Sequence, residues 1–208
     1  MKELHLISNG KMELGEFAEL VSNIFPYLTG IHLREKTVGA RDLYFGISEL
    51  KRVGVLSRKI VVNDRVDVAI AAGVEAVQLP FHSLEVHVVR KSFPNLRIGC
   101  SVHSVAEALI AQEQGADYVL FGHIYPSTSK PGKAPQGVKA LAEVVANVSI
   151  PVIAIGGIKP EHVSEILETG AAGIAVLSTI LEAEDPLAMT KSYADALGGS
   201  LCKNTMSL

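Results

Sequence analysis

The sequence predicts an α/β protein made of a single closed (β/α)8 barrel. Short apolar segments alternate with segments of helical periodicity along the whole chain, and eight such pairs can be recognised. The apolar segments are continuous rather than alternating, as is typical of parallel strands covered on both faces. The length of 208 residues lies near the small end of the range for this fold. A doubly wound open sheet is the alternative, but no second switch of register is visible, which favours the barrel.

The expected strands are short and mostly apolar, and glycine or proline bounds several of them. They cover residues 4–8, 30–34, 59–63, 75–79, 97–102, 117–122, 151–155 and 173–177. The expected helices cover residues 12–28, 39–53, 64–72, 84–91, 104–115 and 137–147, a segment begun by Pro160, and residues 179–196. Asp64 can cap the helix that follows it, and Ser104 with Glu107 matches a capping box. Gly46 weakens the second helix.

Composition limits the classes of function. The net charge is −3 and no long basic run occurs, which disfavours nucleic-acid binding because phosphates require clustered Lys and Arg. No apolar stretch approaches the roughly 20 residues of a membrane helix, and no secretory signal is visible. Cys100 and Cys202 form no Cys-x-x-Cys motif, so we expect reduced thiols and a cytoplasmic protein. Cys100 is expected to pack in the core, with a place in the site as the alternative. We expect one barrel domain over residues 1–197 and a flexible tail over residues 198–208.

The strongest candidate site lies in the stretch from Asp117 to Gly137. A buried strand ends at Gly122, and His123 follows at once. The loop after it carries hydroxyls and a lysine, namely Ser127, Thr128, Ser129 and Lys130. Ligands of parallel barrels bind at the carboxyl ends of the strands, so His123 stands where an acid or base is expected. A lone histidine beside a strand is more often a structural residue, but the polar loop favours a site.

Residues after the other strands are candidates for binding a ligand. They are Ser8, Arg34, Lys36, Asn63, Asp64, Gln78, Ser101, His103, Gly156, Gly157, Leu177 and Ser178. Side chains alternate along a strand, so His32 and Arg34 share one face while Ile31 and Leu33 share the other. If the apolar pair faces the helices, Arg34 points into the barrel mouth. A charge there favours a ligand or a carboxylate partner.

The last two strands predict a phosphate site. Gly156-Gly157 and Leu177-Ser178 follow them, where many (β/α)8 barrels bind phosphate. Glycine lets backbone N–H groups approach an anion, although a tight turn is the alternative. Neither a GxGxxG motif nor a Walker loop is present. A metal is poorly supported, because no two histidines have ligand spacing and only Asp64 is a well-placed carboxylate.

Several segments, in order, resemble the thiamin phosphate synthase superfamily. They span about residues 4 to 195 and comprise Leu33–Lys36, Val62–Ala69, Ser101–Ser104, Ala116–Val119, Pro126–Pro131, Ile155–Ile158 and Ala175–Ser178. Within the superfamily, the chain looks most like the TenI-type thiazole tautomerases. The resemblance implies a (β/α)8 barrel, commonly a homodimer, with a role in thiamin biosynthesis.

Two positions distinguish the members of this superfamily. Synthases usually carry Gly-Pro-Ile-Phe-Pro in the sixth strand, but residues 122–126 here are Gly-His-Ile-Tyr-Pro. A histidine at the position of His123 is the catalytic residue of the tautomerases. Synthases also carry an acidic magnesium ligand after the fourth strand, where this chain has Ser83. The residues that match synthase positions for the pyrimidine pyrophosphate are Arg34, Lys36, Asn63, Ser127, Ser129 and Lys130. In a tautomerase these would meet a carboxylate or be inherited.

The resemblance therefore implies an isomerase, a thiazole tautomerase with His123 as its acid–base residue and no metal or organic cofactor. Its substrate would be a phosphorylated thiazole, the carboxythiazole phosphate with an exocyclic double bond. Its product would be the aromatic carboxythiazole phosphate. A thiamin phosphate synthase is the first alternative, and a non-catalytic regulatory barrel is the second.

Overall fold

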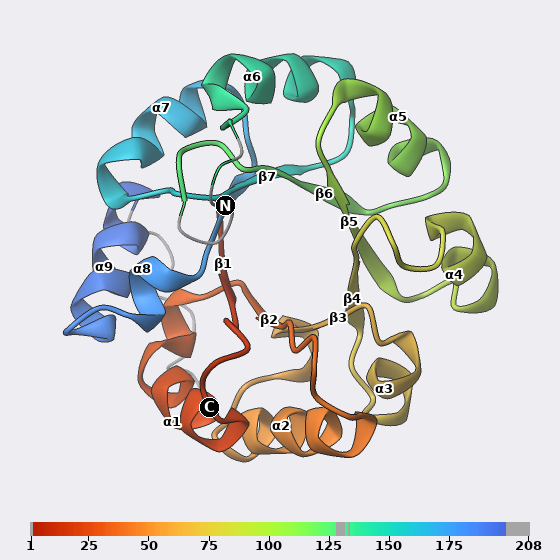
Figure 1. Cartoon of the computed structure of the whole chain (residues 1–208), viewed down its shortest axis with the longest axis vertical. Helices are drawn as coiled ribbons and strands as arrows, with labels where there is room; N and C mark the ends of the chain where they lie inside the picture. Colours follow the sequence, from red (N-terminus) through yellow and green to blue (C-terminus); the bar gives the residue numbers. More distant parts are fainter. Residues whose placement is uncertain (1, 128–131, 133, 199–208) are drawn as a thin grey trace.

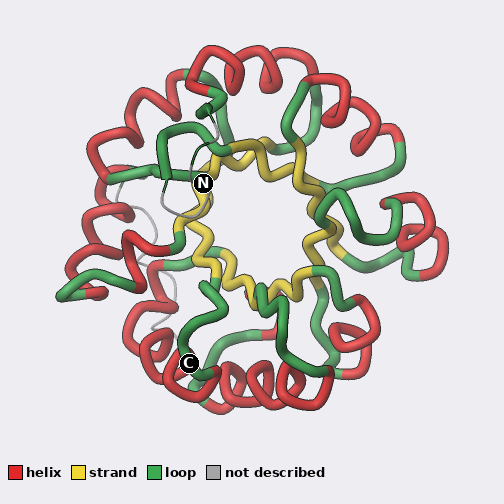
Figure 2. The backbone as a smooth tube through the Cα atoms, viewed as in Figure 1, coloured by secondary structure: helices red, strands yellow, loops and turns green. Residues whose placement is uncertain are grey.

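Eight parallel strands close into a barrel, and the helices surround it (Figures 1 and 2). This computed structural model describes residues 2–127, 132 and 134–198. The first strand, β1 (Glu3–Ile7), pairs in parallel with the last, β8 (Gly173–Val176). That pairing closes the sheet and excludes the doubly wound alternative. The predicted (β/α)8 barrel is confirmed.

The elements alternate as predicted. The remaining strands are β2 (Gly30–Leu33), β3 (Ile60–Asn63), β4 (Ala76–Leu79), β5 (Arg97–Val102), β6 (Tyr118–Gly122) and β7 (Val152–Ile155). The α-helices are α1 (Leu14–Ile24), α2 (Ala40–Arg52), α3 (Val66–Ala71), α4 (Val86–Ser92), α5 (Val105–Glu113), α6 (Gly137–Asn147), α7 (Val163–Glu168), α8 (Ser178–Leu181) and α9 (Pro186–Ala196). Three 3-10 turns, Phe25–Tyr27, Ser57–Lys59 and Pro160–His162, complete the regular structure of the described residues.

Prolines account for three differences from the predicted helices. The first helix ends at Ile24 and Pro26 lies in a 3-10 turn, since proline cannot donate the hydrogen bond of a continuing α-helix. Pro160 likewise begins a 3-10 turn, and α7 follows it. The helix predicted over residues 179–196 is two helices. Pro186 begins the second, and Asp185 caps it by accepting a hydrogen bond from the Ala188 N–H at 2.9 Å.

The two predicted caps have different outcomes. Asp64 does not cap α3: the cap position is Arg65, and no side chain bonds there. Asp64 instead has a positive φ of 68°, which turns the chain between β3 and the helix. Ser104 caps α5 as predicted, accepting from the Glu107 N–H at 3.1 Å. The Glu107 carboxylate, however, accepts from the N–H of His103 at 2.7 Å, so the box is displaced by one residue.

The apolar core has two parts. The larger part lies between the sheet and the helices, and it contains Ile31 and Leu33, both fully buried. Hydrophobic side chains that point into the barrel form a smaller cluster of Ile7, Tyr118, Leu120, Ile153 and Ala175. The barrel interior is therefore filled by side chains, as closure of eight strands requires. Its open end, at the carboxyl ends of the strands, is the place left for a ligand.

A network of charged and polar side chains crosses the barrel interior. Arg97 pairs with Glu3 at 3.1 Å. Glu3 accepts from Nε2 of His5 at 2.8 Å, and Nδ1 of His5 lies 2.9 Å from Nε2 of His32. Burial alone would raise the pKa of Glu3, but the hydrogen bond from His5 and the charges of His5 and Arg97 lower it from 4.5 to about 2. Burial holds the pKa of His32 well below its ordinary value. This network links β1, β2 and β5 across the barrel.

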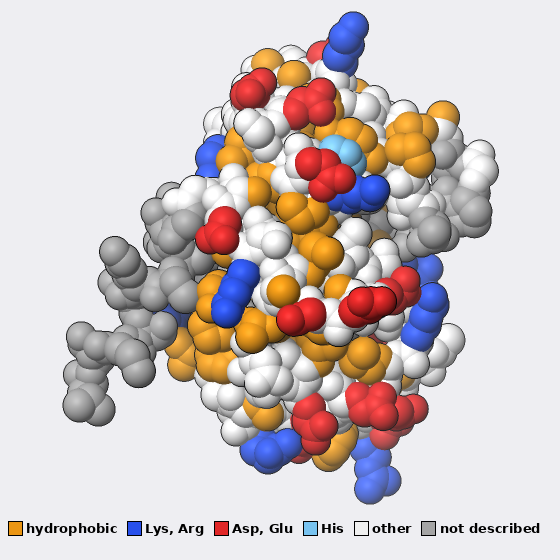
Figure 3. Space-filling model, turned by 90° about the vertical axis from the view of Figure 1, so that its left-hand side faces the viewer, with side chains coloured by type: hydrophobic (Ala, Val, Ile, Leu, Met, Phe, Trp, Pro, Cys, Tyr) orange, Lys and Arg blue, Asp and Glu red, His pale blue; other side chains and the backbone are white. Residues whose placement is uncertain are grey.

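The surface is mixed in charge. On the face drawn in Figure 3, acidic and basic side chains are interspersed among apolar ones rather than separated by sign. Within the described residues, no helix combines the length and apolar character needed to span a membrane.

Candidate active site

A cavity of about 1090 Å³ opens at the carboxyl ends of the strands. Residues at or after all eight strands line it, from Ile7 on β1 to Leu177 after β8. Parallel strands bring their carboxyl ends to one rim, so side chains far apart in sequence share this space. The cavity is where the sequence predicts the site.

Most predicted site residues line this cavity. They are Arg34, Lys36, Asn63, Ser101, His103, His123, Ser127, Gly156, Gly157, Leu177 and Ser178. Ser129 and Lys130 lie outside the described residues. Sequence reasoning missed further polar and aromatic lining residues, namely Asn9, Lys11, Glu35, Arg65, Phe81, His82, Thr179 and Glu182. Each follows a strand within a few residues, so a wider window at the strand ends could have found most of them.

His123 is buried at the wall of the cavity, with 6% of its surface exposed. It follows β6, and the Gly122–His123 peptide bond is cis. The loop after β7 packs directly against it: a Cβ at Gly156 would lie 2.3 Å from the His123 Cβ. Only glycine permits this approach, because such a contact is far below van der Waals distance. The predicted acid–base residue and the first predicted phosphate glycine are therefore neighbours.

The loops after β6 and β7 are joined along their backbones. Ile124 N–H donates to the Ile155 carbonyl, and Tyr125 N–H donates to the Gly156 carbonyl, both at 3.0 Å. Gly157 has a φ of 66°, and a Cβ there would lie 2.4 Å from the Pro126 carbonyl oxygen. The glycine pair thus serves loop packing as well as any anion. A larger residue at 157 would therefore crowd the loop after β6 as well as any bound anion.

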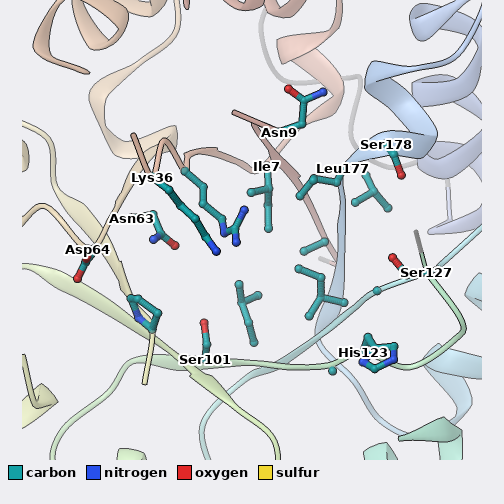
Figure 4. Close-up of a pocket in the computed structure, with 18 of the residues that line it drawn as sticks. Ile7, Asn9, Lys36, Asn63, Asp64, Ser101, His123, Ser127, Leu177 and Ser178 are labelled. Carbon is teal, nitrogen blue, oxygen red and sulfur yellow. The ribbon is translucent and has the colours of Figure 1, made fainter. Parts of the chain in front are cut away.

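The opposite side of the cavity carries cationic and amide side chains. In Figure 4, Lys36 and Asn63 lie across the cavity from His123, and Lys36 extends toward its centre. The Ser8 hydroxyl anchors the β2 loop, donating to the Glu35 carboxylate at 2.5 Å and accepting from the Arg34 N–H at 2.8 Å. Burial raises the pKa of Glu35, and the hydrogen bond from Ser8 offsets part of that rise.

Alternation along β5 divides its side chains between the cavity and the core. Ser101 lines the cavity, whereas Cys100 packs with the core between sheet and helices. Burial, followed by the charge of Glu107, raises the pKa of the Cys100 thiol to about 11. Cys100 is therefore a packing residue, the reading that the sequence favoured. His103 lines the rim, and Glu107 contacts its Nδ1 at 3.3 Å.

The residues present are a poor match for magnesium. Asp64 lines the cavity, but it lies at its edge in Figure 4, and its carboxylate is 3.8 Å from His82. Ser83 lies in the turn after Pro80, where its N–H donates to the Pro80 carbonyl, and it does not line the cavity. In the described part of the chain, no three His, Cys, Asp or Glu side chains gather as a metal site. Magnesium prefers oxygen ligands in near-octahedral geometry.

The fold and cavity define a (β/α)8-barrel protein with a candidate site at the carboxyl ends of the strands. A family model described as thiamine monophosphate synthase matches residues 4–180, and the chain belongs to this family. These are enzymes of thiamin biosynthesis, so the superfamily that the sequence resembles is confirmed.

The relatives are close in length as well as in sequence. A thiamine-phosphate synthase of Pyrococcus horikoshii is 37% identical over 184 residues, covering 88% of each chain. One from Chlorobium limicola is 42% identical over 177 residues, covering 84% of this chain and 82% of the relative. A thiamine phosphate pyrophosphorylase structure from Pyrococcus furiosus superposes with a TM-score of 0.81 at 33% identity, covering 95% and 96%. These names favour the synthase alternative over the tautomerase, and the isomerase class is not confirmed.

Proposed function

We propose that the protein is a thiazole tautomerase that converts the carboxythiazole phosphate with an exocyclic double bond into its aromatic isomer. The observation that carries the proposal is His123, a histidine in the cavity wall, packed against the glycine loop after β7. An imidazole is the side chain best suited to accept and return a proton near neutral pH.

The proposed reaction moves one proton and changes no other bond to hydrogen. His123 removes the proton from the ring carbon that bears the carboxylate, and the electrons of that C–H bond spread into a dienolate-like anion. The resulting imidazolium then protonates the exocyclic carbon. The exocyclic double bond becomes a single bond to a CH2 group of the side chain that carries the phosphate, and the ring becomes aromatic. Aromatisation supplies the driving force, so the residues need only lower the barrier.

Cationic side chains in the same cavity support this assignment. Arg34 and Lys36 both line the cavity. A positive charge beside the substrate carboxylate stabilises the anion that forms when the proton leaves. Lys130, the third candidate from the sequence, lies outside the described residues.

The phosphate of the substrate is proposed to lie at the loops after β7 and β8. Gly156 and Gly157 line the cavity together with Leu177 and Ser178, where α8 begins. Backbone N–H groups in this part of a (β/α)8 barrel are suited to bind an anion. The substrate would then extend from this phosphate site past His123 toward Lys36.

A thiamin phosphate synthase is the second candidate, because the named relatives are synthases and because Arg34, Lys36 and Asn63 all line the cavity. Two residues oppose it. His123 replaces the usual proline, and Ser83 stands in place of an acidic magnesium ligand and outside the cavity lining. The pyrophosphate of that reaction would lack part of its metal support.

Two assays on one preparation decide between the candidates. We expect rapid conversion of the non-aromatic tautomer, followed by ultraviolet absorbance, and little or no thiamin phosphate from the two phosphorylated halves with magnesium. Robust condensation without tautomerisation would establish the synthase instead. Absence of both activities, with the phosphorylated thiazole still bound, would support a regulatory barrel.

The homodimer also stays a proposal, which light scattering can test.

A further inference from the structure

Gln78 is a buried amide at the carboxyl end of β4 that the proposed mechanism does not use. Its exposed fraction is 1%, and it does not line the cavity. Its Nε2 donates a hydrogen bond to the Ser101 hydroxyl oxygen at 3.0 Å. Ser101 does line the cavity, and Figure 4 shows its hydroxyl directed inward. Gln78 therefore touches the site through Ser101.

The direction of this hydrogen bond determines what Ser101 can do. An amide nitrogen donates and cannot accept, so the Ser101 oxygen is the acceptor in this contact. A serine hydroxyl has one proton, and that proton is left for another acceptor. With Gln78 in place, Ser101 presents a donor to the cavity. Without it, the Ser101 hydroxyl could rotate among several orientations.

Packing holds Gln78 in this orientation. Gly99 is its partner in the β4–β5 register, and a Cβ at 99 would lie 2.3 Å from Gln78 Oε1 and 2.5 Å from the Tyr118 hydroxyl. The amide and the phenol thus fill the space that Gly99 leaves. Among the described residues, Gln78 Oε1 and the Tyr118 hydroxyl have no hydrogen-bond partner. A buried amide satisfied only on its nitrogen side costs stability, which points to a role for that nitrogen.

We propose that Gln78 is a positioning residue that fixes the Ser101 hydroxyl as a hydrogen-bond donor to the substrate carboxylate. The inference rests on the proposed function and names the part of the substrate that each side of the cavity recognises. The glycine loops lie beside His123 and would take the phosphate. Ser101 shares the cavity with Arg34 and Lys36, whose charges also suit a carboxylate.

Equilibrium binding of two compounds tests this role without requiring turnover. The first is the product, carboxythiazole phosphate, and the second is the same thiazole phosphate without the carboxylate. Calorimetry would measure the Kd of both for wild type, Ser101→Ala, Gln78→Met and the double variant. Methionine matches glutamine in length but does not donate a hydrogen bond. Tyr118→Phe is the matched control, because it removes a neighbouring buried hydroxyl that, among the described residues, makes no hydrogen bond.

We expect Ser101→Ala to weaken binding of the carboxylated compound by about 10- to 100-fold, the range for a hydrogen bond to a charged group. Gln78→Met should weaken it by about 3- to 10-fold, since the serine remains but is no longer oriented. The double variant should bind no more weakly than Ser101→Ala. Binding of the decarboxylated compound should stay within about 2-fold in every variant. Tyr118→Phe should change neither.

The outcomes separate this inference from the proposed function. A wild type without preference for the carboxylated compound would overturn the proposed substrate. A preference that is unchanged in Gln78→Met would overturn the role of Gln78 and leave the proposed substrate standing. Additive losses in the double variant, or equal losses for both compounds, would also reject positioning through Ser101. If thermal melting shows Gln78→Met to be unfolded, Gln78→Asn provides the comparison, because its amide is one methylene too short to reach Ser101.

Discussion

The side chain on which the proposed reaction depends is His123, and its replacement gives the most direct prediction. His123→Gln should lower kcat by about 10²- to 10⁴-fold, the usual contribution of a positioned acid–base group. KM should change little because the glycine loops are untouched. Initial rates on the non-aromatic tautomer would measure both constants, with circular dichroism to establish folding.

His103→Asn is the control for this prediction. His103 also lines the cavity, but it lies at the rim beside Glu107, so its loss should reduce turnover less. Near-normal turnover in a folded His123→Gln protein would contradict the mechanism and make His123 a structural residue.

Gly99 illustrates how one residue inside the barrel sets the space for its neighbours. A Cβ at this position would lie 2.2 Å from Cζ of Tyr118. Gly99→Ala should therefore lower the free energy of unfolding by about 1–3 kcal/mol through overpacking. Gly15→Ala is the matched control, since nothing lies within 4 Å of its Cβ position and alanine favours the helix by roughly 0.5–1 kcal/mol. Urea unfolding compares the two, and equal effects would reject the packing argument.

At the scale of elements, the loops after β6 and β7 behave as one unit. Gly157→Ala would place a methyl group against the Pro126 carbonyl at a positive φ. We expect it to lower kcat and raise KM together, because the loop it displaces carries His123 while its own loop faces the proposed phosphate. Steady-state kinetics on the tautomer would measure both.

Gly170→Ala is the control for that loop prediction. Its φ is also positive, at 89°. Among the described residues, the only neighbour within 4 Å of its Cβ position is the side chain of Val145, at 3.1 Å. It shares the backbone strain without touching the site, so it should lower stability and leave kinetic constants unchanged. A Gly157→Ala protein with wild-type KM would mean that the phosphate lies elsewhere.

For the whole molecule, the polar network inside the barrel predicts how stability depends on pH. The pKa of Glu3 is lowered from 4.5 to about 2 in the folded protein. Its ionised form therefore stabilises the fold above pH 4.5, and this stabilisation is lost as the pH falls from 4.5 toward 2. A shift of this size corresponds to about 3 kcal/mol.

Glu3→Gln should remove this part of the acid sensitivity. Urea unfolding at pH 6, 5, 4 and 3 would reveal a shallower decline than in wild type below pH 4.5. Glu16→Gln, on the exposed face of α1, is the matched control and should retain the full decline. If stability declined as steeply with falling pH in Glu3→Gln as in wild type, the contacts of Glu3 with His5 and Arg97 would not stabilise its carboxylate.

Two sequence predictions concern the molecule as a whole and stay predictions. One is the homodimer. The other is the domain limit at residue 197, since residues 199–208 lie outside the described part of the chain.

The sequence by itself determined the fold class and the general position of the candidate site. Periodicity is a local signal, and eight parallel strands bring their carboxyl ends to one rim, so His123, Arg34 and Ser101 had to lie near one another. The displaced capping box at Ser104 and the left-handed turn at Asp64 show where local propensity was overruled. At Ser104, the Glu107 carboxylate bonds to the N–H of His103 instead of the N–H of Ser104. At Asp64, the chain changes direction after β3, and the residue does not cap the helix.

Only the tertiary structure decided which side chains touch. The contacts of Gln78 with Ser101, of Gly156 with His123 and of His5 with His32 join residues 23 to 33 positions apart. They depend on register and on the small space inside a closed barrel, where one added methyl group would not fit. The pattern of residues along one strand indicates which side chains point to each face of the sheet. It does not indicate which side chain of the neighbouring strand they will contact.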